Sequence, residues 1–377
     1  MKITEIKVHL AAEWRTFLFV EVKTDAGITG FGESGLTTRE LAVEGAITHL
    51  TPLIIGQDPF DTEILWQRMA RTGFYPAGNA VSAAISAIDI ALWDIKAQAL
   101  DVPLYKLIGG KSRDRVMVYN HLNSSSTETL TADVTRAKAD GWKCVRFEPS
   151  YSPDGLFDAD YRIDEAIDSW AAVREAAGPD LHLAYDVHTK LNLSQAIRLC
   201  RAVECFRPFF LEDAVRSDMP HLYTQLRAHV GVPLAAGEQF ANKWQFKPLF
   251  DHNLIDFARI DLCICGGITE GLKIAAMAEA AGIDIAVHNP VGPISTAVSL
   301  HFNIAISNMG VMELPRRPGE TMADAIESDI RWEDGYLLLP ESSGISARLL
   351  TGALNRYPFA PAELPHCHRT DGSFTNW

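Results

Sequence analysis

Two different spacings of hydrophobic residues follow one another along the chain and predict two kinds of structure. Between residues 2 and 34 apolar and polar positions alternate, as in ITEIKVHL and FLFVEVKT, and a turn at 25–27 separates two such runs. This alternation is typical of antiparallel strands. From residue 40 to about 100 the spacing becomes helical, most clearly in AVSAAISAIDIALWDIKAQAL. We therefore expect the first ~110 residues to form a strand-then-helix unit.

Beyond Val116 short apolar runs alternate with helical segments such as LKIAAMAEAAG. Strands joined by crossover helices form parallel sheets, and eight such strands indicate a closed barrel. After Pro315 the repeat fades into the turn-rich EDGYLLLPESSGIS, and we expect this last segment to pack back on the N-terminal unit. The predicted barrel strands are VMVYNH, KCVRFE, LHLAYD, FFLED, PLAAGE, FARID, DIAVH and VMEL.

Three of these runs end in an acidic residue at equal spacing: Asp186, Glu212 and Glu238 follow one another at 26-residue intervals. Functional groups of such barrels gather at the C-terminal ends of the strands. Converging carboxylates repel one another, and a hard divalent cation removes that cost because it prefers oxygen ligands. An acid after a strand can also be only a helix cap, but the shared phase favours a Mg²⁺ site, with Mn²⁺ as a substitute.

The same phase continues at Asp261, His288 and Glu313, which follow at intervals of 23, 27 and 25 residues. Six polar residues thus recur at predicted strand ends with the spacing of one strand-helix unit. This common phase favours an enzyme over a set of unrelated loop acids.

Composition narrows the choice of partners and compartment. The net charge of −14 opposes binding to nucleic acid, which is itself a polyanion. No apolar stretch reaches the ~18 residues needed to span a membrane. The N-terminus lacks a signal-peptide core, so we expect a cytoplasmic protein. The six cysteines form no CxxC pair and are expected to be reduced. We also expect a homo-oligomer.

These features resemble the enolase superfamily, in its mandelate racemase-like branch, over essentially the whole chain. The resemblance rests on the segment ALWDIKAQALDVPLYKLIGG, on the three carboxylates and on the Asp261–His288 pair. It implies an α/β fold, a modified TIM (β/α)7β barrel with an α+β capping domain that the N-terminal segment and the C-terminal tail form. We place the capping domain at residues 1–113, the barrel at 114–325 and the C-terminal segment at 326–377.

Within this branch the chain is most similar to galactonate dehydratase and related acid-sugar dehydratases. His188 stands two residues after Asp186, and the tail from His368 to Trp377 resembles the C-terminal signature of that group. His121 resembles a substrate-contacting histidine of the mannonate dehydratases, although Asp261 departs from their pattern.

The expected catalytic residues take different roles in proton transfer. His288 is the predicted general base, oriented by Asp261 on the neighbouring strand. His188 is the predicted general acid for the departing hydroxide. Glu313 is expected to be protonated and to donate a hydrogen bond to the enediolate oxygen. His288 could instead be a buried histidine satisfied by a backbone carbonyl, and His188 a loop histidine or one that lies behind the metal ligands. Glu313 could be a strand-end acid paired with Arg316 or Arg317.

Substrate contacts are predicted on the second barrel strand and on two loops of the capping domain. Many relatives carry a Lys-x-Lys pair at the end of this strand, with the second lysine as a base, where this chain has Arg146 and Glu148. An arginine stays protonated, so it is a poor base. Arg146 is expected either to contact substrate or to pair with an acid. The capping-loop contacts are predicted at Trp14, Arg15, Tyr75 and Asn79.

The predicted function is dehydration of a small sugar acid to a 2-keto-3-deoxy acid, through an enediolate that Mg²⁺ and Glu313 stabilise. Galactonate is the first choice of substrate, followed by mannonate, gluconate and arabinonate. An epimerase or cycloisomerase using the same enediolate is the enzymatic alternative. A non-catalytic carboxylate-binding protein is the alternative from another class, and the complete set of acids and histidines argues against it.

Overall fold

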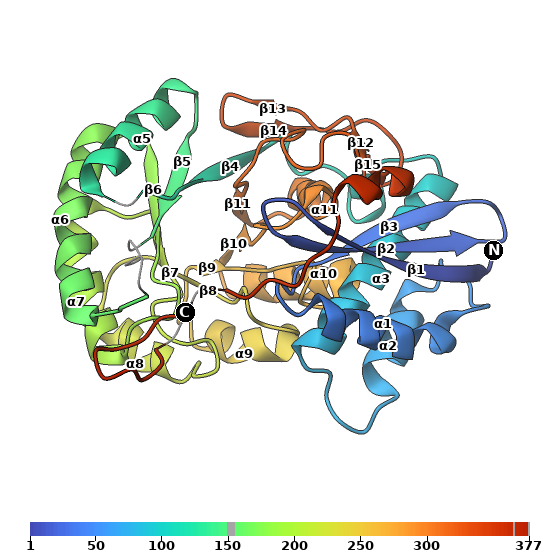
Figure 1. Ribbon diagram of the computed structural model, residues 1–377, viewed down its shortest axis with the longest axis horizontal. Helices are drawn as coiled ribbons and strands as arrows, with labels where there is room; N and C mark the ends of the chain where they lie inside the picture. The colour runs from blue at the N-terminus through green and yellow to red at the C-terminus, as the bar shows by residue number, and fades with distance from the viewer. Residues whose placement is uncertain (125, 149–154, 365, 376–377) are drawn as a thin grey trace.

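The computed structural model describes residues 1–124, 126–148, 155–364 and 366–375, so Trp377 lies outside it. Figure 1 shows a strand barrel with helices α5 to α8 along its outside, beside a smaller blue unit built from the start of the chain. The predicted mixed α/β architecture is confirmed.

The N-terminal unit has the predicted strand-then-helix order. Three antiparallel strands pair in the order β1-β2-β3 and pack against helix α3. Gly30 and Gly32 of β3 allow this contact, because a Cβ atom at either position would lie about 2 Å from a carbonyl oxygen of α3. The elements are β1 (Ile3–Ala12), β2 (Thr16–Thr24), β3 (Thr29–Ser34), α1 (Glu40–Ile54), α2 (Thr62–Arg71), α3 (Asn79–Ala99) and α4 (Leu104–Leu107).

Eight parallel strands run in the order β4 to β11, and β11 pairs with β4 through Met312–Val118 and Glu313–Tyr119, which closes the barrel. Seven helices in the described part of the chain connect consecutive strands, so the predicted (β/α)7β barrel is confirmed. The elements are β4 (Arg115–Leu122), α5 (Thr127–Ala139), β5 (Cys144–Phe147), α6 (Ala159–Ala177), β6 (His182–Asp186), α7 (Leu193–Val203), η1 (Glu204–Phe206), β7 (Phe210–Glu212), α8 (Leu222–His229), β8 (Leu234–Ala236), α9 (Lys243–Asp251), β9 (Phe257–Ala258), α10 (Gly267–Ala280), β10 (Asp284–Val287), α11 (Pro293–Ala305) and β11 (Met309–Glu313).

The C-terminal segment contacts both units. Strand β14 pairs antiparallel with β4 of the barrel, and the carbonyl of Tyr357 accepts the N–H of Ala12. The chain then reaches the loop before α6, where His368 forms an isolated parallel bridge with Leu156. The elements are β12 (Ile326–Ser328), β13 (Trp332–Glu333), β14 (Tyr336–Leu338), β15 (Ala347–Leu349) and η2 (Thr351–Arg356). The limits proposed for the three parts of the chain stay predictions.

Three buried acids of the N-terminal unit tie it to the rest of the chain. Glu33 of β3 accepts the backbone N–H groups at the start of α11, and Asp89 of α3 accepts those at the start of α10. Asp94 accepts the N–H of Ile345. Burial raises the pKa of Glu33 to about 8, that of Asp89 to about 7 and that of Asp94 to about 6.

Among the residues described, no helix combines the length and apolarity that crossing a membrane would require.

Candidate active site

The barrel brings the three evenly spaced carboxylates to its C-terminal end. Asp186 and Glu212 are direct partners in the pairing of β6 with β7, and Glu238 follows two residues after the end of β8. Asp186 and Glu212 are fully buried, and Glu238 is 8% exposed. The three acids therefore occupy neighbouring strand ends at one end of the barrel, as their spacing predicts.

Two arginines neutralise these acids from inside the protein. Arg146, on β5, forms an ion pair with Asp186. Arg259, just after β9, forms ion pairs with Glu212 and with Glu313. Of the two roles expected for Arg146, the structure shows the pairing with an acid.

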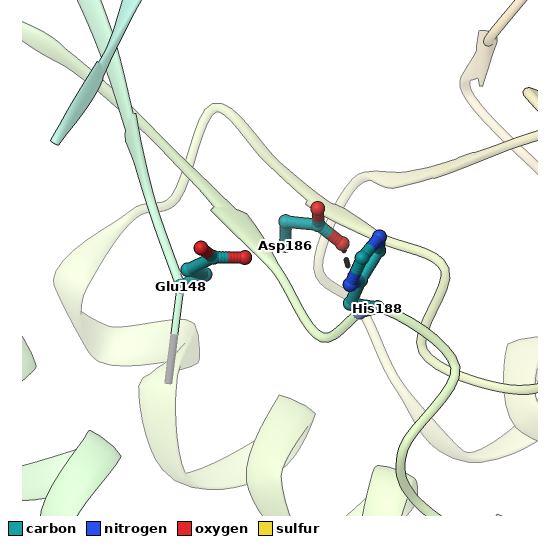
Figure 2. Close-up of side chains that lie close together, drawn as sticks. All are labelled: Glu148, Asp186 and His188. Carbon is teal, nitrogen blue, oxygen red and sulfur yellow. Dashed lines mark hydrogen bonds between the residues drawn. The ribbon is translucent and has the colours of Figure 1, made fainter. Parts of the chain in front are cut away.

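The tightest group of potential metal ligands differs from the predicted triad. Figure 2 shows Asp186 between Glu148 and His188, and one ligand atom from each of these residues lies within 4.8 Å of the other two. Among the described residues this is the one group of three or more that lies so close together. Arg146 holds one oxygen of Asp186, and Arg259 holds one oxygen of Glu212.

The donor set nevertheless fits a hard divalent cation. Oε2 of Glu212 is buried and accepts no hydrogen bond from the described residues. Burial raises the pKa of Glu212 and raises that of Glu238 well above its usual range, and neighbouring carboxylates add to both shifts. Both shifts indicate that the negative charge of these carboxylates is only partly balanced by nearby positive charge. A cation bound by their oxygen atoms would balance the rest.

His288 and Asp261 form the predicted dyad. Nδ1 of His288 lies 2.7 Å from Oδ2 of Asp261, whose other oxygen accepts the N–H of Cys263 at 2.6 Å. Nε2 of His288 lies 3.4 Å from Oε2 of Glu238, so it faces the carboxylate group. The buried Asp261 thus fixes the proton on Nδ1 and leaves Nε2 as a base directed toward the candidate metal site.

His188 lies beside the same carboxylates. Its backbone is left-handed, with φ of 56°, and its N–H donates to Oδ1 of Asp186 at 2.7 Å. Burial lowers the pKa of His188, while the charge of Asp186 opposes that shift. The left-handed backbone places His188 and Asp186 together in one cluster even though β6 has already ended (Figure 2).

The surroundings of Glu313 disfavour the protonated state expected from the sequence. Burial alone would raise its pKa, but Arg259, His288 and His121 together hold the pKa of Glu313 well below its usual value. An ionised carboxylate accepts hydrogen bonds and donates none. The lowered pKa disfavours the protonated form in this arrangement, and donation by Glu313 to an enediolate oxygen stays a prediction.

The ring of His121 is engaged on both sides by protein groups. Nε2 lies 2.5 Å from Oε1 of Glu313, and Nδ1 lies 3.2 Å from Nη2 of Arg146. Since Glu313 is ionised and an arginine can only donate, Nε2 carries the proton and Nδ1 accepts. Contact of His121 with a substrate stays a prediction, and it would require one of these two partners to move.

The four predicted capping-loop residues differ in how close they come to the barrel. Arg15, which is partly buried, donates to Thr37. Burial lowers the pKa of Arg15, and the nearby acids Glu33 and Asp261 oppose that shift. Nε1 of Trp14 donates to Thr321 at 3.1 Å.

Asn79 and Tyr75 are placed differently. The side chain of Asn79 donates to the carbonyl of Gln239, the residue after Glu238. Tyr75 is 81% exposed and its ring packs edge-on against the exposed Phe74. Of these two, Asn79 is therefore the one with a direct link to the loop that carries a predicted metal ligand.

Sequence reasoning missed Arg259, which lies at the centre of the site. The signal was present in FARID, where the arginine is two residues before Asp261 and hence on the same side of an extended chain. A charged residue inside an apolar barrel strand requires buried partners of opposite charge. Its partners, Glu212 and Glu313, could not be identified without the barrel geometry.

Comparison with known proteins gives this geometry a family. The model of the mandelate racemase / muconate lactonizing enzyme N-terminal domain matches residues 5–109, and the enolase C-terminal domain-like model matches residues 129–352. A D-mannonate dehydratase of Caulobacter sp. (strain K31) is 34% identical over 403 residues, and a D-galactonate dehydratase of Xanthomonas oryzae is 34% identical over 386 residues. Both alignments cover 100% of each chain.

Among solved structures, an enolase from Pantoea ananatis with bound D-gluconate and Mg has a TM-score of 0.94 at 26% identity, covering 100% of this chain and 99% of that one. The capped barrel with carboxylates and a His–Asp dyad at its strand ends defines a class of barrel enzymes that work on carboxylate substrates. This chain belongs to the enolase superfamily, in its mandelate racemase / muconate lactonizing enzyme family.

Proposed function

We propose that this protein is a Mg²⁺-dependent hydro-lyase that removes water from an acid sugar to give a 2-keto-3-deoxy acid. The observation that carries the proposal is the His288–Asp261 dyad, whose Nε2 faces buried carboxylates suited to a cation. Relatives that align over their whole length are named D-mannonate and D-galactonate dehydratases, which supports the reaction class.

The proposed metal ligands are Asp186, Glu212 and Glu238. A bound divalent cation would neutralise the charge that develops on the substrate carboxylate as the α-proton leaves. A guanidinium has five N–H donors, so Arg146 can hold Asp186 and a substrate oxygen at the same time. The two roles expected for Arg146 are therefore compatible.

We propose that one histidine takes a proton from the substrate and the other donates a proton to it. Nε2 of His288 takes the proton from C2, and the electron pair of the C–H bond moves into the enediolate. The bond from C3 to its hydroxyl oxygen then breaks, and His188 donates the proton that turns the leaving group into water. The resulting enol tautomerises to the 2-keto acid.

Protonation of His188 fits the arrival of an anionic substrate. Burial lowers the pKa of His188, and a substrate carboxylate nearby would raise it again because opposite charges stabilise the imidazolium. Binding of the substrate would thereby favour the protonated form of His188, which is the form that donates a proton.

Galactonate stays the first choice of substrate, with mannonate, gluconate and arabinonate next. A panel of aldonates and aldarates should be incubated with the Mg²⁺-loaded protein, and 2-keto products detected with semicarbazide. An epimerase would consume substrate without a semicarbazide signal, and a non-catalytic protein would give neither product nor C2 exchange in D₂O. Either outcome across the whole panel would overturn the proposal. The homo-oligomer and the cytoplasmic location stay predictions.

A further inference from the structure

Arg259 is a fully buried cation beneath the candidate metal site. It follows β9 directly, is 0% exposed, and its guanidinium lies 5.6 Å from the centre of the Tyr119 ring. Tyr119 belongs to a buried apolar layer inside the barrel. A charge in such surroundings is costly unless it is paired and hydrogen-bonded. The position therefore requires a specific set of partners.

The guanidinium has partners on each of its three nitrogens. Nε donates to Oε1 of Glu212, and Nη2 donates to Oε2 of Glu313. Nη1 donates to the carbonyls of Ala286 and Val287 at 3.0 and 3.1 Å. Nη2 also lies 4.0 Å from Oε2 of Glu238. Arg259 thus contacts two of the three proposed metal ligands and one neighbouring acid from below.

Its contact with Glu212 determines which oxygen that residue can offer. Oε1 is held by Arg259, whereas Oε2 is buried without a hydrogen bond from the described residues. The arginine is charged at any accessible pH, so its pairing with Glu212 does not depend on its own protonation. A lysine has no planar fork and could not hold both Glu212 and Glu313 in this way.

We infer that Arg259 is a positioning residue and a counter-ion of the carboxylates. It fixes Glu212 as a ligand that offers one oxygen, and its charge weakens the affinity of the site for a cation. The inference rests on the proposed metal site. Arg259 supplies part of the positive charge that the carboxylates need, and binding of a cation would work against that like charge.

The size of this effect can be bounded. Two unit charges about 4–5 Å apart at an effective dielectric constant of about 20 repel strongly enough to change an affinity by far more than tenfold. Relaxation of the freed carboxylates would return part of that gain. We therefore expect Arg259→Met to tighten Mg²⁺ binding by at least about tenfold. Arg259→Lys keeps the charge but loses the planar fork, so it should tighten binding by less than Arg259→Met does.

Calorimetric titration of MgCl₂ into the chelator-stripped full-length protein tests this. The matched control is Arg227→Met, because Arg227 pairs with Asp256 and with the carbonyls of Leu254 and Val232, outside the carboxylate site. This control should bind Mg²⁺ as the wild type does. Unchanged or weaker binding by Arg259→Met would overturn the inference while leaving the proposed function intact. Absence of Mg²⁺ binding by the wild type would instead defeat the metal site and the inference together.

Thermal unfolding provides a second readout. Without Arg259 the buried acids lack their counter-ion, so the metal-free Arg259→Met protein should melt well below the wild type. Added Mg²⁺ should raise its Tm by more than it raises that of the wild type, because the cation takes over the missing charge. An Arg259→Met protein that folds only with Mg²⁺ supports the inference, and one that stays unfolded at every Mg²⁺ concentration contradicts it.

Discussion

Replacing Asp261 with asparagine should reverse the proton positions on His288 and remove the base. Oδ1 of Asp261 accepts the N–H of Cys263 at 2.6 Å, and Oδ2 lies 2.7 Å from Nδ1 of His288. In Asp261→Asn the amide oxygen must stay on the Cys263 side, because turning it would set two buried donors against each other at a cost of about 1–3 kcal/mol. The amide NH₂ then faces Nδ1.

An imidazole that accepts at Nδ1 carries its proton on Nε2, which can no longer take a proton from C2. The same substitution in the serine protease triad leaves the histidine in the wrong tautomer and lowers kcat about 10⁴-fold. General-base catalysis as a whole contributes about 10²–10⁴-fold. We therefore expect kcat to fall by about 10²–10⁴, or about 3–5 kcal/mol of activation free energy at 1.36 kcal/mol per tenfold.

The assay is 2-keto acid formation with semicarbazide, together with exchange of the C2 proton in D₂O by proton NMR. Both should fall in parallel, since the lost step precedes each of them. Asp256→Asn is the matched control, because Asp256 directly precedes β9 at the opposite end of the strand and accepts the N–H of Leu234. A folded Asp261→Asn protein with kcat within about threefold of the wild type would refute the role of the dyad.

Three further predictions concern the metal, the two histidines and pH. Chelation with EDTA should abolish turnover and Mg²⁺ or Mn²⁺ should restore it; full activity after exhaustive chelation would contradict the metal site. His288→Asn should lose both dehydration and C2 exchange, whereas His188→Asn should lose dehydration but retain exchange, and the opposite pattern would reverse the two roles. The pKa of Glu33 is raised to about 8, so the folded state keeps a proton that the unfolded state loses above about pH 4.5. The contribution of this proton to the free energy of unfolding is therefore complete below pH 4.5 and is lost as the pH rises through 8. Tm should therefore decline between about pH 5 and 8 and decline less in Glu33→Gln, and equal slopes in the two proteins would count against the buried acid as the cause.

The sequence allowed most of the fold to be predicted because barrel strands and helices have distinct hydrophobic periods. All eight predicted barrel strands are present, and the carboxylates at Asp186, Glu212 and Glu238 lie at or just beyond strand ends. The phase of polar residues carried this information, since strand-helix units of similar length bring equivalent positions to the same end of the barrel.

What the sequence could not supply is the pairing of charges across the barrel. Glu313 was expected to be protonated because several carboxylates were known to converge, but no pattern showed that Arg259 reaches it from β9, across the intervening β10. For the same reason His121 was assigned only to substrate, although its ring lies between Arg146 and Glu313. Such contacts depend on which strands are neighbours and on side-chain length, and neither is encoded in local spacing.

Closure of the barrel has a consequence for the order in which the chain can mature during synthesis. Strand β4 needs β11 and β14 as partners, and these leave the ribosome about 200 residues later. Glu313 arrives on the last barrel strand, and Asp94 waits for the N–H of Ile345. The acids made first must stay hydrated until partners near the other end of the chain emerge, since buried charges without partners are costly. A ribosome that stalls before Glu313 would therefore leave a nascent chain with an open sheet edge and an incomplete set of charges.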